Sequence, residues 1–406
     1  MNKYEVLSPA GDIECLKSAV DFGADAVYLA GTQFGMRTAS KNFTEDELAR
    51  GIEYAHSRGV RVHITCNVLP RSRELDALPR FLETAQSLGA DAFIIADLGV
   101  LEMAKKYAPK VERHASTQTG IVNYASANFL HSLGVSRVVL ARELSLDEIA
   151  EIRRRTSPEL EIETFVHGSM CVSFSGRCLI SSYMTGRDAN RGDCAQPCRW
   201  KYHLFEENRE GQFFPVEQDE NGTFLYNSRD LCMIDHLPEL LQTGVTSLKI
   251  EGRAKSSYYT SAVTKAYAGA VRAYEADPVG YVLPQWAHDE VYKVSHREYN
   301  TGFFFGGEPG QNTSNGGYIR TYDVVAMCES DGENGVCTIT QRNKFLVGDE
   351  LDVLAPNAPS FTVRVSALYN ENGESVESAP HAMERLKMVC GKDIPKGAYL
   401  RKKKIN

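Results

Sequence analysis

Apolar and polar positions follow a repeated pattern along the first 255 residues of the chain. In each repeat a helical pattern ends at a glycine, and a short apolar segment follows directly. Glycine often follows the last residue of a helix because it adopts the left-handed backbone found there. An apolar run of roughly four to eight residues is typical of a buried strand. The pattern occurs at residues 23–28, 59–64, 89–94, 134–139 and 244–249.

Three further apolar segments bring the number of expected strands to eight: 5–7, 111–115 and 160–166. Helices fill the intervals, and two of them begin with capping boxes, Thr44 with Glu47 and Ser145 with Glu148. Eight strand–helix units predict an α/β fold, a (β/α)8 TIM-like barrel, over residues 1–276. An open doubly wound sheet is the alternative. We favour the barrel because of the eight units and because no Gly-x-Gly-x-x-Gly follows the first strand.

Polar side chains follow the expected strands at their carboxyl ends, where barrel enzymes place their catalytic groups. Lys249 and Glu251 are two positions apart on one strand, so they are expected to face the same side. We select four candidate catalytic residues from these strand ends: His167, Arg142, Arg253 and Glu251. The full set, here called the polar ring, comprises Ser8, Asn67, Asp97, Ser116 to Gln118, Arg142, Glu143, His167, Ser169 and Glu251 to Arg253.

Several members of the polar ring also have a structural interpretation. Asn67 and Asp97 can each cap the helix that follows. Arg142 can form a structural ion pair with its neighbour, and His167 can be a hydrogen-bonded supporting residue. Arg253 is the best candidate for binding a carboxylate, because a planar guanidinium pairs with a carboxylate through two hydrogen bonds.

A cysteine-rich region, residues 163–232, begins within the seventh expected strand. Its first four cysteines have the spacing C-x6-C-x15-C-x3-C, and Cys232 follows them. The usual zinc pattern C-x2-C does not occur. Thiolates from separate loops suit a cubane iron–sulfur cluster, which takes four cysteine ligands. The other five cysteines fall in helix or strand patterns and are expected to be small buried side chains: Cys15, Cys66, Cys328, Cys337 and Cys390.

The sequence around these cysteines resembles the collagenase-like peptidase family. Residues 163–181 begin Glu-Thr-Phe-x-x-Gly-Ser-Met-Cys and, four residues later, continue Gly-x-Cys-x-Ile-Ser. Residues 190–200 and 247–253 also match, and the similarity extends from Ser-Pro-Ala-Gly near the N-terminus to the tail. Some members of this family are called peptidases. Others are oxygen-independent hydroxylases with a 4Fe–4S cluster that act on tRNA, ribosomal RNA or a quinone precursor.

By its length and C-terminal extension, the chain is most similar to the family's tRNA-modifying branch. This resemblance implies that a wobble uridine of tRNA is converted to 5-hydroxyuridine, with prephenate as the oxygen donor. Arg142, Arg253 or Arg177 would then bind this dicarboxylate. The resemblance also implies tRNA as a partner, together with a paralogous or second identical chain, which some relatives need.

The resemblance further implies which thiols bind the cluster. Hydroxylases of the family use two ligand patterns. One includes the cysteine of the Asp-Leu-Cys segment, which is Cys232 here. The other includes both cysteines of the C-x3-C spacing, which are Cys194 and Cys198 here. We expect the first pattern, with Cys198 as the alternate ligand. Its members are Cys171, Cys178, Cys194 and Cys232.

The rest of the chain departs from the barrel pattern. Residues 200–226 alternate around turn sequences and are expected to form an inserted β-hairpin. Residues 277–320 are rich in glycine, asparagine and aromatic residues, so we expect an irregular linker wrapping the barrel. Short apolar segments separated by turns then predict a small β-barrel domain over residues 321–406. The tail, residues 401–404, is basic. Such a run is usually a solvated end, but beside a β-barrel it could contact RNA phosphates, which makes this domain a candidate for docking RNA.

Composition limits the remaining choices. The 406 residues are 43% apolar and 24% charged, which is typical of folded proteins with two or three domains. No run of 18 apolar residues and no apolar signal core occur, so we expect a cytoplasmic protein with reduced thiols and no membrane partner. The net charge of −8 argues against a non-specific nucleic-acid binder but permits a local basic patch.

Two functions therefore compete, an iron–sulfur RNA hydroxylase and a collagenase-like peptidase. We favour the hydroxylase, because the chain contains neither His-Glu-x-x-His nor Gly-x-Ser-x-Gly. A Cys171–His167 nucleophile pair is conceivable, but no clear third group orients it. The polar ring argues against a third alternative, a non-catalytic scaffold.

Overall fold

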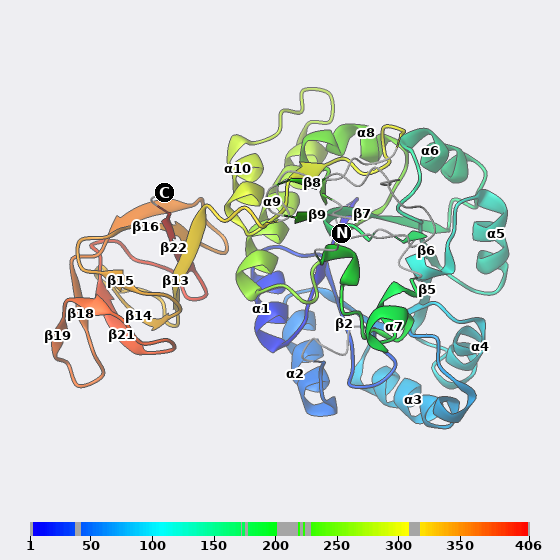
Figure 1. Cartoon of the computed structure of the whole chain (residues 1–406), viewed down its shortest axis with the longest axis horizontal. Coiled ribbons are helices and arrows are strands. Elements are labelled where there is room, and N and C mark those ends of the chain that lie inside the picture. The colour runs from blue at the N-terminus through cyan, green and yellow to red at the C-terminus, as the bar shows by residue number, and fades with distance from the viewer. Residues whose placement is uncertain are drawn as a thin grey trace, which may run out of the picture.

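The computed structural model describes residues 3–36, 42–171, 173–174, 178–200, 218–219, 222–223, 229–307 and 317–404. A large α/β barrel and a smaller β domain lie side by side, with the C-terminal domain coloured orange to red (Figure 1). Each has an apolar core of its own. No helix in the described part of the chain is long and apolar enough to cross a membrane.

The barrel has eight parallel strands, and it closes because β11 pairs with both β1 and β7. Each strand overlaps one of the eight expected segments, so the predicted barrel is confirmed. The strands are β1 (Glu5–Pro9), β2 (Ala26–Leu29), β3 (Arg61–Cys66), β4 (Ala92–Ile95), β5 (Glu112–Ala115), β6 (Arg137–Val139), β7 (Glu161–Ser169) and β11 (Ser247–Ile250).

Helices surround the barrel, and their ends follow from local sequence. The capping boxes of Thr44 with Glu47 and of Ser145 with Glu148 are both present. Asp97 accepts a hydrogen bond from the backbone N–H of Val100, so its role is that of a helix cap. The helices are α1 (Ile13–Asp21), α2 (Glu45–His56), α3 (Leu78–Leu88), α4 (Leu98–Tyr107), α5 (Tyr124–Ser132), α6 (Leu146–Arg154), α8 (Leu237–Gln242) and α9 (Ser257–Ala276).

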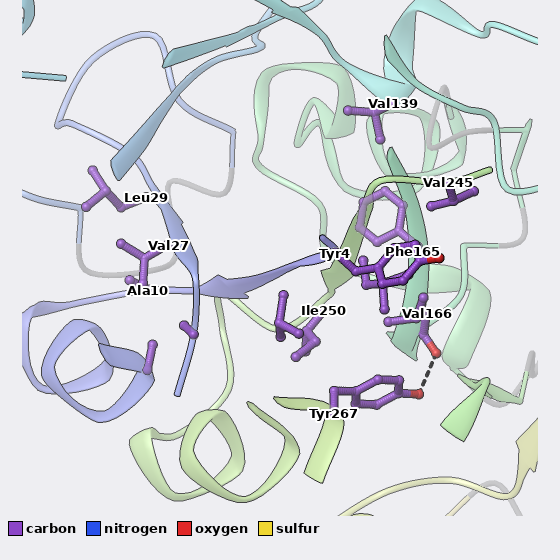
Figure 2. Packing of buried hydrophobic residues seen from close by; sticks show 14 of the residues in the cluster. Tyr4, Ala10, Val27, Leu29, Val139, Phe165, Val166, Val245, Ile250 and Tyr267 are labelled. Atoms are coloured by element: carbon purple, nitrogen blue, oxygen red, sulfur yellow. Dashed lines mark hydrogen bonds between the residues drawn. The ribbon is translucent and has the colours of Figure 1, made fainter. Parts of the chain in front are cut away.

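Helix α9 ties the last part of the barrel together. It packs against α1 and against α10 (Gln285–Lys293), and most of its residues are buried. The Tyr267 hydroxyl donates to the carbonyl of Val166 on β7 at 2.8 Å (Figure 2). Strand β7 carries one extra residue here, because Lys249 pairs with Phe165 whereas the next residue, Ile250, pairs with His167. This bulge fixes the direction of the side chains at the end of β7.

Strand β7 also extends beyond the barrel. Strand β10 (Asp230–Cys232) pairs antiparallel with its end, and β12 (Tyr299–Asn300) pairs with β10. The region 277–320 therefore contains a helix and a strand, which corrects the expectation of an irregular linker. Helix α10 contains no glycine, proline or asparagine, and its residues Ala287 and Val291 are fully buried.

Part of the chain between β7 and β10 lies outside the described residues. Helix α7 (Ile180–Thr185) follows β7. Of the expected hairpin at 200–226, the structure describes two short strands that pair antiparallel, β8 (Gln218–Asp219) and β9 (Gly222–Thr223). Met1, Asn2, Arg177 and the last two residues also lie outside the described part.

The C-terminal domain is an antiparallel half-barrel. Its larger sheet has the order β17-β16-β22-β13-β14-β21-β18-β19, and β15 (Phe345–Leu346) pairs with β20 (Ser378–Ala379) beside it. The strands of the larger sheet are β13 (Tyr322–Cys328), β14 (Val336–Gln341), β16 (Glu350–Leu354), β17 (Phe361–Arg364), β18 (Ala367–Tyr369), β19 (Ser375–Val376), β21 (Arg385–Val389) and β22 (Tyr399–Lys403).

A buried ion network joins this domain to the barrel. Arg401 of β22 makes two contacts of 2.6 Å with the carboxylate of Glu290 on α10. It also donates to Asp352 at 2.9 Å and to the Tyr258 hydroxyl on α9 at 3.0 Å. Of the basic tail, residues 401–404, Arg401 is fully buried and fixes the domain to the barrel, whereas Lys403 and Lys404 are exposed.

Candidate functional site

A cavity of ≈ 370 Å³ opens at the carboxyl ends of the barrel strands. This size lies within the range of small-molecule sites, roughly 300–1,000 Å³. Strand ends form its floor and walls, and described residues between Cys171 and Cys198 line one side. The strand-end residues that line it include Tyr28, Thr65, Ile94, Ser116, Arg142, Phe165, Lys249 and Glu251.

Most of the polar ring lines this cavity. Lys249 and Glu251 both line it, as expected from their spacing on one strand. Three of the four candidate catalytic residues are therefore brought together, and His167 is not among them. The ring members on the cavity are Asn67, Ser116, Thr117, Gln118, Arg142, Ser169, Glu251, Gly252 and Arg253.

The charge of the cavity is opposite to that of the whole chain. Among the described residues that line it, four side chains are cationic, and Glu251 is the single carboxylate. The chain as a whole carries a net charge of −8. A concave site lined by one sign of charge concentrates ligands of the opposite sign. The cavity therefore suits an anion. The cations are Arg142, Lys249, Arg253 and Lys255.

Arg142 is held at the cavity wall from several sides. Its Nη1 donates to the backbone carbonyl of Ser169 at 3.0 Å, and its Nη2 lies 3.7 Å from Oε2 of Glu251. The guanidinium lies 3.9 Å from the ring centre of Phe165. Its Nε is buried and has no hydrogen-bond partner in the described part of the protein. Arg142 is thus oriented at the cavity wall, and the described part of the protein does not satisfy all of its donors.

Arg253 crosses the mouth of the barrel from β11 toward β3. Its Nη1 donates to Oγ1 of Thr65 at 3.0 Å. Its Nη2 donates to Oδ1 of Asn42 at 3.3 Å and also to the carbonyl of Met36. These contacts fix the guanidinium plane at the cavity, which fits the expected role in binding a carboxylate.

His167 does not line the cavity, unlike the other three candidate catalytic residues. The bulge in β7 turns its ring toward α9 and β12, where Nδ1 lies 3.4 Å from the Tyr267 hydroxyl and Nε2 3.4 Å from the Tyr299 hydroxyl. Burial lowers the pKa of His167 to about 3, so the imidazole is neutral near pH 7. Its buried contacts with two tyrosine hydroxyls are those expected of a supporting residue, the alternative interpretation from the sequence.

Three of the four cysteines expected to bind a cluster line the cavity, and the fourth, Cys232, does not. Cys232 is buried and does not line the cavity. It lies opposite His167 in the pairing of β10 with β7, and its Sγ is 3.9 Å from the Tyr267 hydroxyl. Burial raises the pKa of the Cys232 thiol to about 12. The cysteines that do line the cavity are Cys171, Cys178, Cys194 and Cys198.

Backbone N–H groups point at the sulfur atoms of two cavity cysteines. The backbone N–H of Ile180 donates to Sγ of Cys178 at 3.4 Å, and that of Gln196 donates to Sγ of Cys194 at 3.3 Å. Hydrogen bonds to sulfur stabilise the charged form and tune iron–sulfur clusters. Asn190 also holds the main chain at Cys178 through two hydrogen bonds. The residue type of these sulfur donors and their position at the cavity therefore fit a cluster bound by cysteine thiolates.

The cysteines do not converge on a single point. No three His, Cys, Asp or Glu side chains in the described ranges are close enough to hold one metal ion. In a cubane each cysteine binds a different iron, so its ligands need not meet at one ion. This arrangement disfavours a mononuclear site more than a cluster.

Comparison with known proteins assigns the family. Residues 11–314 match peptidase family U32, and residues 320–401 match the C-terminal domain of that family. The chain belongs to peptidase family U32. The resemblance inferred from the cysteine-rich region is thereby confirmed.

Three curated relatives illustrate the similarity. The tRNA hydroxylation protein P1 of Bacillus subtilis (strain 168) is 36% identical over 99% of this chain and 95% of its own length. The tRNA hydroxylation protein P of Escherichia coli (strain K12) is 32% identical over 94% of this chain and 92% of its own. The 23S rRNA 5-hydroxycytidine C2501 synthase of the same strain is 39% identical over 66% of this chain and 39% of its own.

Sequence reasoning did not select two of the cavity cations, Lys249 and Lys255. Lys249 was placed on the same face as Glu251 but was given no role. A stronger signal was available, because a lysine between apolar residues of a buried strand needs a partner or a ligand. Lys255 follows Arg253 by two residues and was overlooked because the strand ends before it.

Proposed function

We propose that this U32-family protein is an oxygen-independent RNA hydroxylase that converts a wobble uridine of tRNA to 5-hydroxyuridine. The observation that carries the proposal is the cationic cavity at the barrel mouth with four cysteines on its wall. Two relatives named as tRNA hydroxylation proteins align over nearly the whole chain, including the C-terminal domain, and support the substrate.

A 4Fe–4S cluster at the cavity wall is part of this proposal. Cys171, Cys178 and Cys194 would hold it in either ligand pattern. Cys198 lies at the cavity, whereas family resemblance favours Cys232, so the fourth ligand is left to experiment. When bound, such a cluster supplies electron transfer next to the cavity. The N–H groups at Cys178 and Cys194 would stabilise the thiolates.

The remaining polar groups have roles that follow from their chemistry. Arg142 and Arg253 would bind the carboxylates of prephenate, the proposed oxygen donor, through charge-assisted hydrogen bonds. Glu251 lies 3.7 Å from Arg142 and would hold its guanidinium while the cavity fills. In the overall change, the C5–H bond of uridine is replaced by C5–OH, which is a two-electron oxidation. The donor loses a hydroxyl group through cleavage of its C–O bond and is reduced by the same two electrons, so that U–H and R–OH become U–OH and R–H.

The peptidase alternative has little support from the geometry. A cysteine peptidase needs a base beside its nucleophile. His167 points away from the cavity toward Tyr267 and Tyr299, while Cys171 lines the cavity. The residues described therefore contain no Cys171–His167 pair.

The test is a defined reaction with purified components. Protein purified without oxygen is incubated with a tRNA transcript bearing uridine at the wobble position and with prephenate, and the digested nucleosides are analysed by mass spectrometry. We expect 5-hydroxyuridine that depends on both protein and prephenate. A transcript with cytidine at that position is the matched control. If uridine is unchanged while the protein carries iron, the proposed reaction is wrong. Cleavage of a collagen peptide under these conditions would favour the peptidase.

A further inference from the structure

Lys249 lies at the floor of the cavity in an unusual environment for an ammonium group. Its side chain comes from β11, is only 6% exposed and lines the cavity. The rings of Tyr28 and Phe165 flank it, with Nζ 4.5 Å and 5.4 Å from their centres. Burying a charge is costly unless it is paired and hydrogen-bonded, so its partners decide its role.

The partner below Lys249 is Glu163. Its Oε1 accepts from Nζ at 2.8 Å. Its other oxygen, Oε2, accepts from Nη1 of Arg137 at 3.0 Å. Arg137 is bound in turn by Glu5 and by Glu161. Because Glu5 and Glu161 already balance Arg137, the charge of Glu163 holds Lys249 in place from below through a single hydrogen bond.

The ammonium of Lys249 also keeps donor capacity for a ligand. A lysine has three N–H donors and no acceptor. Within the described part of the protein, Glu163 is the acceptor found for them. The remaining donors face the aromatic rings and the cavity. A buried cation held from below, with donors left on the cavity side, has the properties of an anion-binding group.

Arg142 approaches the same place from the cavity wall. Its guanidinium lies 3.9 Å from the ring centre of Phe165, the ring that Lys249 also contacts. The buried Nε of Arg142 has no partner in the described part of the protein. Two cations with unused donors thus adjoin one aromatic side chain at the bottom of the cavity.

We infer that Lys249 and Arg142 form an anion subsite at the cavity floor that binds a carboxylate of the small organic acid co-substrate. The inference rests on the proposed function for the identity of that acid. A carboxylate suits the subsite better than an RNA phosphate, because Lys249 is almost completely enclosed and a polynucleotide backbone cannot reach it. Lys249 is then a substrate-binding residue, and Glu163 is a positioning residue that holds it.

The simpler role for Lys249 is to neutralise Glu163. That role predicts a change in stability alone, whereas the subsite predicts a change in ligand affinity in protein that is still folded. Lys249→Gln separates the two, because the amide can still donate to Glu163 but carries no charge. Lys249→Met removes the charge and the donor together.

Isothermal titration calorimetry with prephenate and with malonate, on anaerobically purified full-length protein, tests the subsite. We expect Lys249→Gln and Lys249→Met to weaken the binding of at least one acid by about tenfold or more, the effect of losing one charge-assisted hydrogen bond. Lys105→Met removes an exposed lysine on α4 and should bind as the wild type does. Iron content and melting temperature are measured on each variant.

Each outcome bears on the subsite separately from the proposed function. If malonate but not prephenate binds in a Lys249-dependent way, the subsite stands and the proposed donor is wrong. If folded Lys249→Gln protein binds both acids as tightly as the wild type, or if the wild type binds neither, the subsite is wrong. Neither result depends on whether the protein hydroxylates RNA.

Discussion

Two groups of cysteines in this protein differ in their surroundings. Those around the cavity lie on turns and short helices, and they are exposed or partly exposed. Those of the C-terminal domain lie on β13, on β14 and just after β21, and all are buried. The first set comprises Cys171, Cys178, Cys194 and Cys198, and the second comprises Cys328, Cys337 and Cys390.

The difference comes from the backbone that carries each thiol. In the C-terminal domain, strand alternation turns Cys328 and Cys337 into the apolar core with Ile339 and Met388. Around the cavity, turns present Cys178 and Cys194 with backbone N–H groups aimed at sulfur. The same residue type is thus a small apolar side chain in one region and a potential ligand in the other.

The largest predicted effect is the loss of iron and of hydroxylation when a cavity cysteine, but not a C-terminal cysteine, is replaced. Replacing Cys171, Cys178 or Cys194 by alanine should remove the cluster and abolish RNA hydroxylation, because each is a ligand in either pattern. Cys328→Ala should keep both. Iron per chain and 5-hydroxyuridine yield, measured on anaerobic protein, check this. Equal iron loss in both groups would contradict the distinction.

The next effect concerns how the C-terminal domain is attached. Arg401→Met should destabilise the protein by about 3–5 kcal/mol, because it leaves the buried carboxylate of Glu290 with the longer ion pair of 3.5 Å to Lys293. Lys404→Met, which removes an exposed pair with Asp323, should cost about 1 kcal/mol or less. Urea unfolding of both variants measures the difference. Similar costs would show that the network does not hold the domains together.

The pH dependence of stability should come from the barrel. Burial lowers the pKa of His167 to about 3, and it also lowers the pKa values of His63 and His114. The unfolded chain binds protons at these histidines below about pH 6.5, but the folded chain does not, so stability falls as the pH drops from about 6.5 toward 3. Each histidine contributes up to about 1.4 kcal/mol per pH unit.

His167→Gln should reduce this slope by the contribution of one proton. The free energy of unfolding of wild type and variant is measured between pH 7.5 and 5. An unchanged slope would mean that His167 is protonated in the folded protein, contrary to its buried position.

The smallest effect lies in the C-terminal core. Cys337→Ala should cost roughly 1 kcal/mol, because it removes one buried sulfur and leaves a small cavity. Hydroxylation and iron content should not change. Thermal unfolding together with iron analysis checks both expectations, and loss of iron would give this region an unexpected part in cluster binding.

Regular backbone was predictable from the sequence, and deviations from it were not. All eight barrel strands and both capping boxes follow from local patterns, as does the shared face of Lys249 and Glu251. The bulge in β7 reverses the direction of His167, and alternation along a strand cannot reveal it. Whether Cys198 or Cys232 faces the cavity depends on the paths of loops, and the spacing of cysteines in the sequence does not determine these paths.

The central claim is that the cavity thiols hold an iron–sulfur cluster. Iron and acid-labile sulfide analysis with a visible spectrum, on anaerobically purified wild type, tests it most directly. We predict about four irons per chain and a broad band at roughly 400 nm. Loss of the band in Cys198→Ala or in Cys232→Ala identifies the fourth ligand. A folded protein without colour, iron or sulfide would contradict the account.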